Sequence, residues 1–209
     1  MNILHVTSST RGSASYSNRV ADQVIAELRT RNPGATVTTR NVAADPLPHI
    51  DDDFVAATRS PQGPQTAHQR ALLAQSDALV DELFAADVVV IAAPMINFTI
   101  PSSLKAWIDY VARAGRTFSY SEAGPKGLVT GKQVIVVGAR GGVYAGAGKA
   151  VDFQLPYLKS VLGFLGMTDV EVLEVDGTAY GPEAAEKAVA AANAKLHAQC
   201  DARATAIAA

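Results

Sequence analysis

A continuous apolar run at residues 88–93, rich in β-branched side chains and followed directly by Pro94, limits the possible folds of this sequence most strongly. Such a run is typical of a strand that is buried on both faces in the middle of a parallel sheet. Pro94 has no N–H for a ladder, so we expect the strand to stop there. Ligands of open parallel sheets bind beyond the carboxyl ends of the strands. The turn at 95–98 is therefore where we look for a flat, mostly apolar ligand.

Four more strand patterns alternate with helical patterns along the chain. We predict strands at 3–7, 35–41, 88–93, 133–139 and 170–175. We predict helices from 17 to the Pro33–Gly34 stop, from 66 through 84, at 102–114 with Gly115 as C-cap, at 154–165 ending at Gly166, and at 182–206. Five strands alternating with helices predict a doubly wound α/β fold with a five-stranded parallel sheet. Right-handed crossovers favour the strand order 2-1-3-4-5.

Three stretches fall outside this pattern. Residues 42–64 hold four prolines and read as a long irregular loop, which in a compact domain is usually a lid or wall of a site. Residues 116–132 form an insertion before the fourth strand, and residues 141–148 form a glycine-rich loop after it. Neither a repeat nor a linker divides the chain, so we expect one domain over residues 1–209.

Composition excludes several classes of protein. The chain has 209 residues, and its net charge of −2 argues against nonspecific nucleic-acid binding, which needs a basic face. No apolar run approaches the roughly 18 residues of a membrane span. The only cysteine, Cys200, cannot form an internal disulfide, which fits a reducing cytoplasm. His49 beside the acidic residues 51–53 suggests a metal, but the spacing matches no ligand set and favours a solvated acidic loop, so we expect no metal site.

The loop at 8–18 is rich in hydroxyls and leads into the start of a helix. It contains neither G-x-G-x-x-G nor G-x-x-x-x-G-K-[ST], which argues against a dinucleotide pyrophosphate or a P-loop. Free N–H groups at the helix start, together with Ser15 and Ser17, can hold a phosphate monoester. The alternative is that these serines are ordinary helix caps and turn residues.

Two more loops follow the third and fourth strands. In the turn at 94–98, apolar side chains can pack on a planar ring while amides and Asn97 reach its polar edge. In the loop at 139–144, Gly141 and Gly142 allow close approach of the backbone and can direct N–H groups at developing negative charge. An ordinary strand-to-helix turn and a flexible loop remain the alternatives for these two segments.

A phosphate cradle, an apolar slot with an amide edge and a glycine-rich edge together describe a site for flavin mononucleotide (FMN). The sequence here resembles the FMN-dependent NADH-azoreductases, which are flavodoxin-like NAD(P)H:quinone oxidoreductases. The resemblance is carried by segments spread over nearly the whole chain, at 15–18, 92–98, 112–115, 124–132, 140–142 and 179–182.

The resemblance implies a set of FMN contacts but no catalytic side chain. The contacts are Ser9, Ser15, Tyr16, Ser17, Met95, Ile96, Asn97, Phe98, Ala139, Arg140, Gly141 and Gly142. Ile96 stands where the family often has Tyr, and Ala139 stands where Ser is frequent. Because neither change removes a backbone contact, we expect FMN binding to persist.

The resemblance also implies an activity and an assembly. The expected enzyme binds FMN tightly but noncovalently, uses NADH or NADPH as co-substrate, and reduces quinones and azo compounds by ping-pong hydride transfer. A cytoplasmic homodimer is expected, with the site closed by the partner subunit, and Phe118 and Tyr120 of the insertion are candidates for the site walls or for packing the insertion onto the body. The alternatives are a flavodoxin-type electron carrier, an NADPH-dependent FMN or chromate reductase of similar fold, and a binding module without enzymatic activity.

Overall fold

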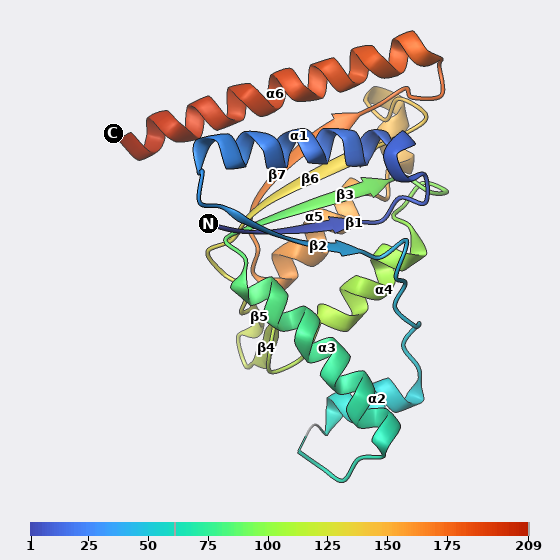
Figure 1. The fold of residues 1–209 in the computed structure, drawn as a ribbon. Coiled ribbons are helices and arrows are strands. Elements are labelled where there is room, and N and C mark those ends of the chain that lie inside the picture. Colours follow the sequence, from blue (N-terminus) through green and yellow to red (C-terminus); the bar gives the residue numbers. More distant parts are fainter. Residues whose placement is uncertain (61, 209) are drawn as a thin grey trace.

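The computed structural model describes residues 1–60 and 62–208, and a five-stranded parallel sheet of order β2-β1-β3-β6-β7 forms its centre (Figure 1). These strands are β1 (Asn2–Thr7), β2 (Thr36–Asn41), β3 (Val88–Pro94), β6 (Gln133–Ala139) and β7 (Asp169–Val175). Counted by the strands of this sheet alone, the order is 2-1-3-4-5. The predicted fold class and topology are therefore confirmed.

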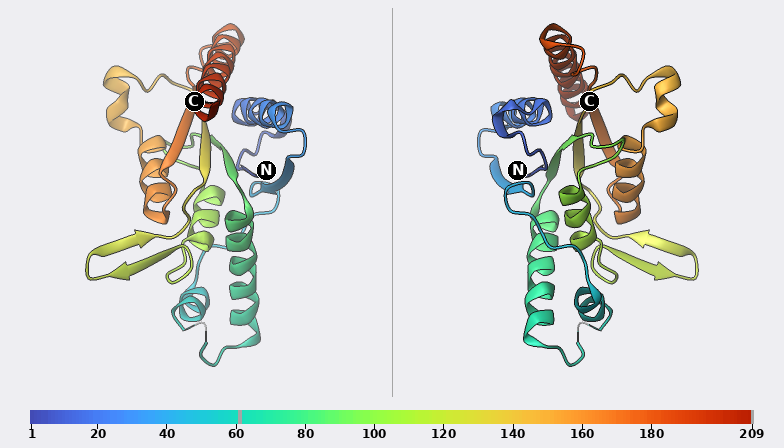
Figure 2. Two further views of the ribbon diagram at one scale, coloured as in Figure 1. Left: turned by 90° about the vertical axis from the view of Figure 1, so that its left-hand side faces the viewer. Right: turned by 90° about the vertical axis from the view of Figure 1, so that its right-hand side faces the viewer.

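Helices cover both faces of the sheet (Figure 2). One face packs against α1 (Tyr16–Arg31) and α6 (Pro182–Ala208), and the other against α3 (Ala67–Ala85), α4 (Ser102–Val111) and α5 (Leu155–Leu165). Residues of β3 alternate between the two cores: Val90 packs toward α1 and Ile91 toward α3 and α4, both fully buried. This two-sided burial explains the unbroken apolar run, and the strand ends at Pro94 as predicted.

The predicted irregular stretch at 42–64 contains a helix, α2 (Asp52–Arg59), so the prediction of a loop throughout was wrong there. Asp51 caps this helix by accepting a hydrogen bond from the N–H of Phe54 at 2.8 Å, and the following aspartates lie in the first turn, where the helix dipole favours negative charge. Phe54 anchors the helix in the core. Pro61, within the predicted stretch, lies outside the described residues.

The connection after α4 also differs from the prediction. Helix α4 ends at Val111, and Gly115 does not cap it; the Gly115 N–H donates to Phe118 O at 2.8 Å in a separate turn, with a φ of +78°. The helix stops early because the hydroxyl of Thr117 accepts the N–H of Arg113 at 2.8 Å. The predicted insertion is an antiparallel hairpin of β4 (Phe118–Ser121) and β5 (Gly124–Gly127), which projects from the body (Figure 2).

Strand register brings the carboxyl ends of the central strands to one edge. Thr7 lies opposite Ala92, Pro94 opposite Ala139, and Ala139 opposite Val175. Short 3-10 turns, η1 (Gly12–Ala14) and η2 (Gly146–Val151), belong to the loops that leave this edge. None of the helices in the described part of the chain is long and apolar enough to span a membrane.

Candidate functional site

A cavity of about 300 Å³ lies at the carboxyl edge of the sheet, where the predicted loops meet. Four chain segments line it: the β1–α1 loop, the turn after β3, the end of β6 and the turn after β7. The lining residues are Ser9, Arg11, Ser15, Tyr16, Pro94, Met95, Ile96, Ala139, Gly141, Thr178 and Ala179. The cavity spans β1 and β3, from which the chain winds to opposite sides of the sheet, and this is the position where open α/β sheets bind ligands.

The start of α1 forms the polar end of this cavity. The Oγ atoms of Ser15 and Ser17 lie 3.0 Å apart, and both residues are almost fully buried. Ser15 caps the helix by accepting the Asn18 N–H at 3.3 Å, so the cap interpretation is correct for this residue. Within the described residues the N–H groups of Tyr16 and Ser17 donate no hydrogen bond. Capping thus leaves two amide donors available at a helix N-terminus, which favours an anion.

Arg11 adds positive charge to the same end. It is exposed, lies 5.6 Å from the ring centre of Tyr16, and has no carboxylate partner among the described residues. Arg19, on the other hand, is held by a bidentate pair with Glu186. Arg11 is therefore a cation beside the two amides with no carboxylate partner in the described chain, and an anionic group bound there would meet both a dipole and a charge.

The turn after β3 carries unusual backbone geometry. Ile96 and Thr99 exchange hydrogen bonds of 2.8 and 3.1 Å, and the two residues between them have positive φ, 46° for Asn97 and 72° for Phe98. This is a two-residue turn of the type that favours Asn followed by Gly. Phe98 in the Gly position is a true outlier, and its side chain is 51% exposed. Backbone strain of this kind is found most often at functional sites.

The loop after β6 is fixed by the turn after β7. The carbonyls of Arg140, Gly141 and Gly142 accept hydrogen bonds from the N–H groups of residues 178, 179 and 177 at 3.1, 3.1 and 2.9 Å. In the described structure the N–H groups of Gly141 and Gly142 themselves have no acceptor. The loop is therefore held through its oxygens, and its donors stay available to a ligand.

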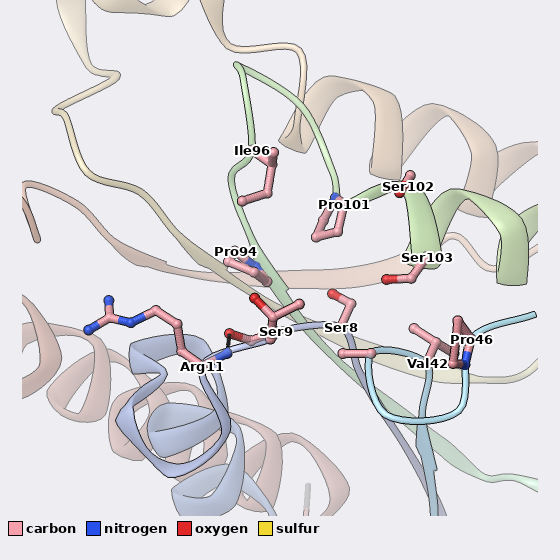
Figure 3. Close-up of a pocket in the computed structure, with 12 residues that line it drawn as sticks. Ser8, Ser9, Arg11, Val42, Pro46, Pro94, Ile96, Pro101, Ser102 and Ser103 are labelled. Atoms are coloured by element: carbon pink, nitrogen blue, oxygen red, sulfur yellow. Dashed lines mark hydrogen bonds between the residues drawn. The ribbon is translucent and has the colours of Figure 1, made fainter.

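A second cavity, of about 390 Å³, adjoins the first across Pro94 and Ile96 (Figure 3). In addition to these residues and to Ser9 and Arg11, it is lined by Ser8, Thr10, Val42, Ala43, Pro46, Pro101, Ser102 and Ser103. Figure 3 shows the Ser103 side chain from α4 facing Ser8 from the β1–α1 loop. The stretch after β2 thus does form a wall beside the site, through Val42, Ala43 and Pro46.

Seven of the twelve predicted contacts line the first cavity: Ser9, Ser15, Tyr16, Met95, Ile96, Ala139 and Gly141. The other five do not line it: Ser17, Asn97, Phe98, Arg140 and Gly142. Ser17 lies behind Ser15, and Arg140 is only 2% exposed because its side chain pairs with carboxylates. Asn97 and Phe98 form the exposed turn beside Ile96, and Gly142 lies against the ring of Tyr144.

Four residues of the first cavity are absent from the predicted contacts: Arg11 and Pro94, which lie in loops that the sequence indicated, and Thr178 and Ala179, which follow β7. Arg11 had a signal, as a cation in the loop before a helix start. Ala179 lies in the segment 179–182 that carried part of the resemblance, although no role was assigned to it. Of the insertion's aromatics, Phe118 packs against Phe164 with ring centres 4.6 Å apart, whereas Tyr120 is 73% exposed.

No Asp, Glu, His, Cys or Lys lines the first cavity within the described residues. The acidic residues near His49 are used elsewhere: Asp51 caps α2, and Asp53 accepts from Gln69 at 2.8 Å. In the described part of the chain no three His, Cys, Asp or Glu residues form a group that could hold a metal ion. The donors of the site are therefore amides, hydroxyls and one guanidinium.

An open α/β sheet of this strand order, with amide donors available at the start of its first helix, is typical of flavodoxin-like proteins, and the comparison with known families agrees. A family model described as flavodoxin-like fold matches residues 1–200, so the chain belongs to this family. Within it, the relatives place the chain in the group of FMN-dependent NADH:quinone oxidoreductases and azoreductases.

Curated relatives and solved structures cover nearly the whole chain. The FMN-dependent NADH:quinone oxidoreductase of Mesorhizobium japonicum is 49% identical over 95% of both chains, and FMN-dependent NADH:quinone oxidoreductase 1 of Rhizobium etli is 54% identical over 93% of this chain and 95% of its own. The crystal structure of an azoreductase from Bacillus anthracis superposes with a TM-score of 0.87 at 30% identity, covering 94% of this chain and 96% of that one. A Bacillus anthracis FMN-dependent NADH-azoreductase in complex with FMN gives 0.84 at 25% identity, covering 95% and 99%.

Proposed function

We propose that this protein is an FMN-dependent NADH:quinone oxidoreductase that reduces quinones to hydroquinones, and azo compounds as well, with residues 1–209 acting as one FMN-binding domain. The names of its relatives supply the cofactor, the donor and the acceptor. The observation that carries the proposal is one cavity lined by Tyr16 and Gly141, where the amides of these two residues and of the residues that follow them, Ser17 and Gly142, have no acceptor in the described structure.

The polar end of the cavity suits the phosphate of FMN. Buried amides without acceptors are costly unless a ligand or water pairs with them, and two lie side by side at the start of α1. Ser9 and Ser15 add hydroxyls, and Arg11 adds a charge. We assign the phosphate to these residues, with Ser17 holding the Ser15 hydroxyl in place across 3.0 Å.

The other end suits a planar ring with a polar edge. Met95 and Ile96 provide apolar surface, and the amides of Gly141 and Gly142 provide donors for the ring's pyrimidine edge. Met95 donates its N–H to Ala139 O at 2.8 Å, which ties the two loops together and fixes the width of the slot between them. The side chains of Ile96 and Ala139, which differ from those that the family often has, leave these backbone donors unchanged.

Bound FMN supplies hydride-relay chemistry, from a nicotinamide donor to a quinone or azo acceptor that follows it at the same site. The chain's part is to hold the ring, to offer amide donors where negative charge develops, and to present the apolar surface of Ile96 and Phe98 to the flat substrates. Among the described lining residues there is no Asp, Glu, His, Cys or Lys, and Tyr16 is the one side chain there of a type that can act as general acid or base.

The test is steady-state turnover by the purified protein reconstituted with FMN. We expect oxidation of NADH in the presence of a benzoquinone, without any partner reductase. The rate should saturate with each substrate, and double-reciprocal plots should give the parallel lines of a ping-pong reaction. An electron carrier would bind FMN but give no turnover, whereas a binding module would bind none. A free-flavin reductase would reduce added FMN in preference to the quinone.

We also propose that the working form is a homodimer located in the cytoplasm. Large apolar side chains are exposed beside the site, including Phe98 and Phe153, which are joined by a 3.0 Å hydrogen bond from the Phe153 N–H to Phe98 O. Such a patch is typical of an interface. The free thiol of Cys200 supports a reducing compartment. Sedimentation should give twice the chain mass, and Phe153→Ser should lower it toward the monomer; a wild-type monomer would contradict the assembly.

A further inference from the structure

Arg140 was expected to touch the cofactor, but its guanidinium is buried in a cluster of carboxylates. Nε lies 2.5 Å from Asp176 Oδ1, one terminal nitrogen lies 2.8 Å from Asp152 Oδ2, and the other lies 3.0 Å from Glu174 Oε1. Burial opposes the charge, yet the hydrogen bonds to Asp176 and Glu174 raise the pKa of Arg140 above its ordinary value. The residue is thus a permanent buried cation that bridges three segments of chain.

The carboxylates of this cluster are themselves fixed to the backbone. Asp152 Oδ1 accepts from the N–H groups of Gln154 and Leu155 at 3.0 and 3.2 Å, at the start of α5. Asp176 Oδ2 accepts from the Tyr144 N–H at 3.2 Å. The cluster therefore clamps the loop after β6 against the turn after β7 and the start of α5.

The clamped loop carries the amides of Gly141 and Gly142. The carbonyls of residues 140–142 are all taken by the turn at 177–179, while the N–H groups of Gly141 and Gly142 stay unpaired within the described residues. Donors held in advance where charge develops stabilise that charge without the cost of reorganising them. Their value depends on how rigidly the loop is held.

We propose that Arg140, clamped by Asp152 and Asp176, is a positioning residue that fixes the Gly141 and Gly142 amides and thereby favours reduced over oxidised FMN. This inference rests on the proposed FMN site. The guanidinium does not touch the cofactor; it acts through the loop. Lysine at this position keeps the charge but, as a point charge on a flexible stem, cannot bridge three carboxylates in a fixed plane.

The test compares Arg140→Lys with a matched variant, Arg113→Lys. Arg113 is also a buried arginine, with hydrogen bonds of 2.6 Å to Ser76 and 3.2 Å to Asp77, and it lines neither cavity. The apoprotein is titrated with oxidised FMN and, anaerobically, with reduced FMN, and the ratio of the two Kd values is compared. The thermal midpoint of unfolding is recorded for each variant.

We expect Arg140→Lys to weaken the binding of reduced FMN at least tenfold more than the binding of oxidised FMN. This ratio corresponds to a two-electron reduction potential of the bound flavin that is about 30 mV lower. Arg113→Lys should lower the thermal midpoint and leave the ratio unchanged. Arg140→Lys disturbs all three buried ion pairs and can therefore unfold the protein, so Asp176→Asn, which leaves Arg140 two carboxylates, is the second variant. We expect it to change the ratio of the two Kd values in the same direction, by at least threefold. Equal losses for both oxidation states would overturn the proposal, whereas failure of the wild type to bind FMN would overturn the proposed function instead.

Discussion

The hydroxyls of Ser15 and Ser17 share a 3.0 Å hydrogen bond at the start of α1, but only Ser15 also caps the helix. Substitutions at the two serines should therefore differ in their effect on stability. Ser17→Ala should weaken FMN binding by about 1 kcal/mol, because it removes the hydrogen bond that holds the Ser15 hydroxyl in place, with little change in stability. Ser15→Ala should weaken FMN similarly and also cost about 1 kcal/mol of stability through the lost cap. Fluorescence titration and chemical denaturation measure the two effects, and unchanged FMN affinity in the double variant would place the phosphate elsewhere.

Gly142→Val should give folded protein that binds FMN poorly. A Cβ at this position would lie 3.4 Å from the Tyr144 ring, so a branched side chain must displace that ring or enter the space beside the Gly142 amide. Circular dichroism should remain native while the flavin absorbance of the purified protein falls. Gly34→Val is the control, because a side chain there meets open space. Normal flavin content in Gly142→Val would refute the ring placement.

Phe98→Gly should not destabilise the protein, although it removes an aromatic side chain. Phe98 has a φ of 72°, which glycine adopts without strain, and about half of its side chain is exposed. Phe84, 37% exposed in the helix α3, is the matched control, and Phe84→Gly should lower stability by about 1 kcal/mol or more. If the side chain contacts flat substrates, KM for the quinone should rise about fivefold in Phe98→Gly, from a loss of about 1 kcal/mol. A clear fall in the thermal midpoint of this variant would show that the turn is not strained.

His5 should make the fold sensitive to acid. Burial lowers the pKa of His5 below its ordinary 6.5, with Asp22 opposing the shift, and its Nε2 has no partner in the described structure. The unfolded chain therefore binds this proton more readily, so the contribution is fully present above about pH 6.5 and is lost as pH falls below it. His5→Leu should flatten the fall in unfolding free energy between pH 7 and 5, by at most about 1.4 kcal/mol per pH unit. Identical slopes in urea titrations of the two proteins would contradict this.

The sheet was predictable because its signals are local. The apolar run of β3 is buried against a core on each face of the sheet. The end of α5 at Gly166 follows from one residue, because glycine readily adopts the positive φ of 103° found there. The helix α2 was missed because eight residues between prolines carry little periodic signal, although Asp51 supplied a cap. Gly115 misled because the end of α4 is decided by a contact with Thr117 rather than by the glycine.

The site was predictable where a loop directly follows a strand, and less so elsewhere. Ser15 and Gly141 each lie in a loop that leaves a strand of the sheet, and both line the cavity as the sequence indicated. Thr178 and Ala179 enter the cavity only because β7 lies beside β6, which is a tertiary fact. The ion pairs of the Arg140 side chain could not be predicted, since its three carboxylates come from positions more than ten residues away in the sequence.

The visible spectrum of the purified protein, recorded anaerobically with and without NADH, tests the central claim most directly. We expect the absorption of one oxidised flavin per chain, its bleaching when NADH is added, and its return when a quinone follows. Protein that holds no flavin after reconstitution with FMN, or a flavin band that NADH leaves unchanged, would contradict it.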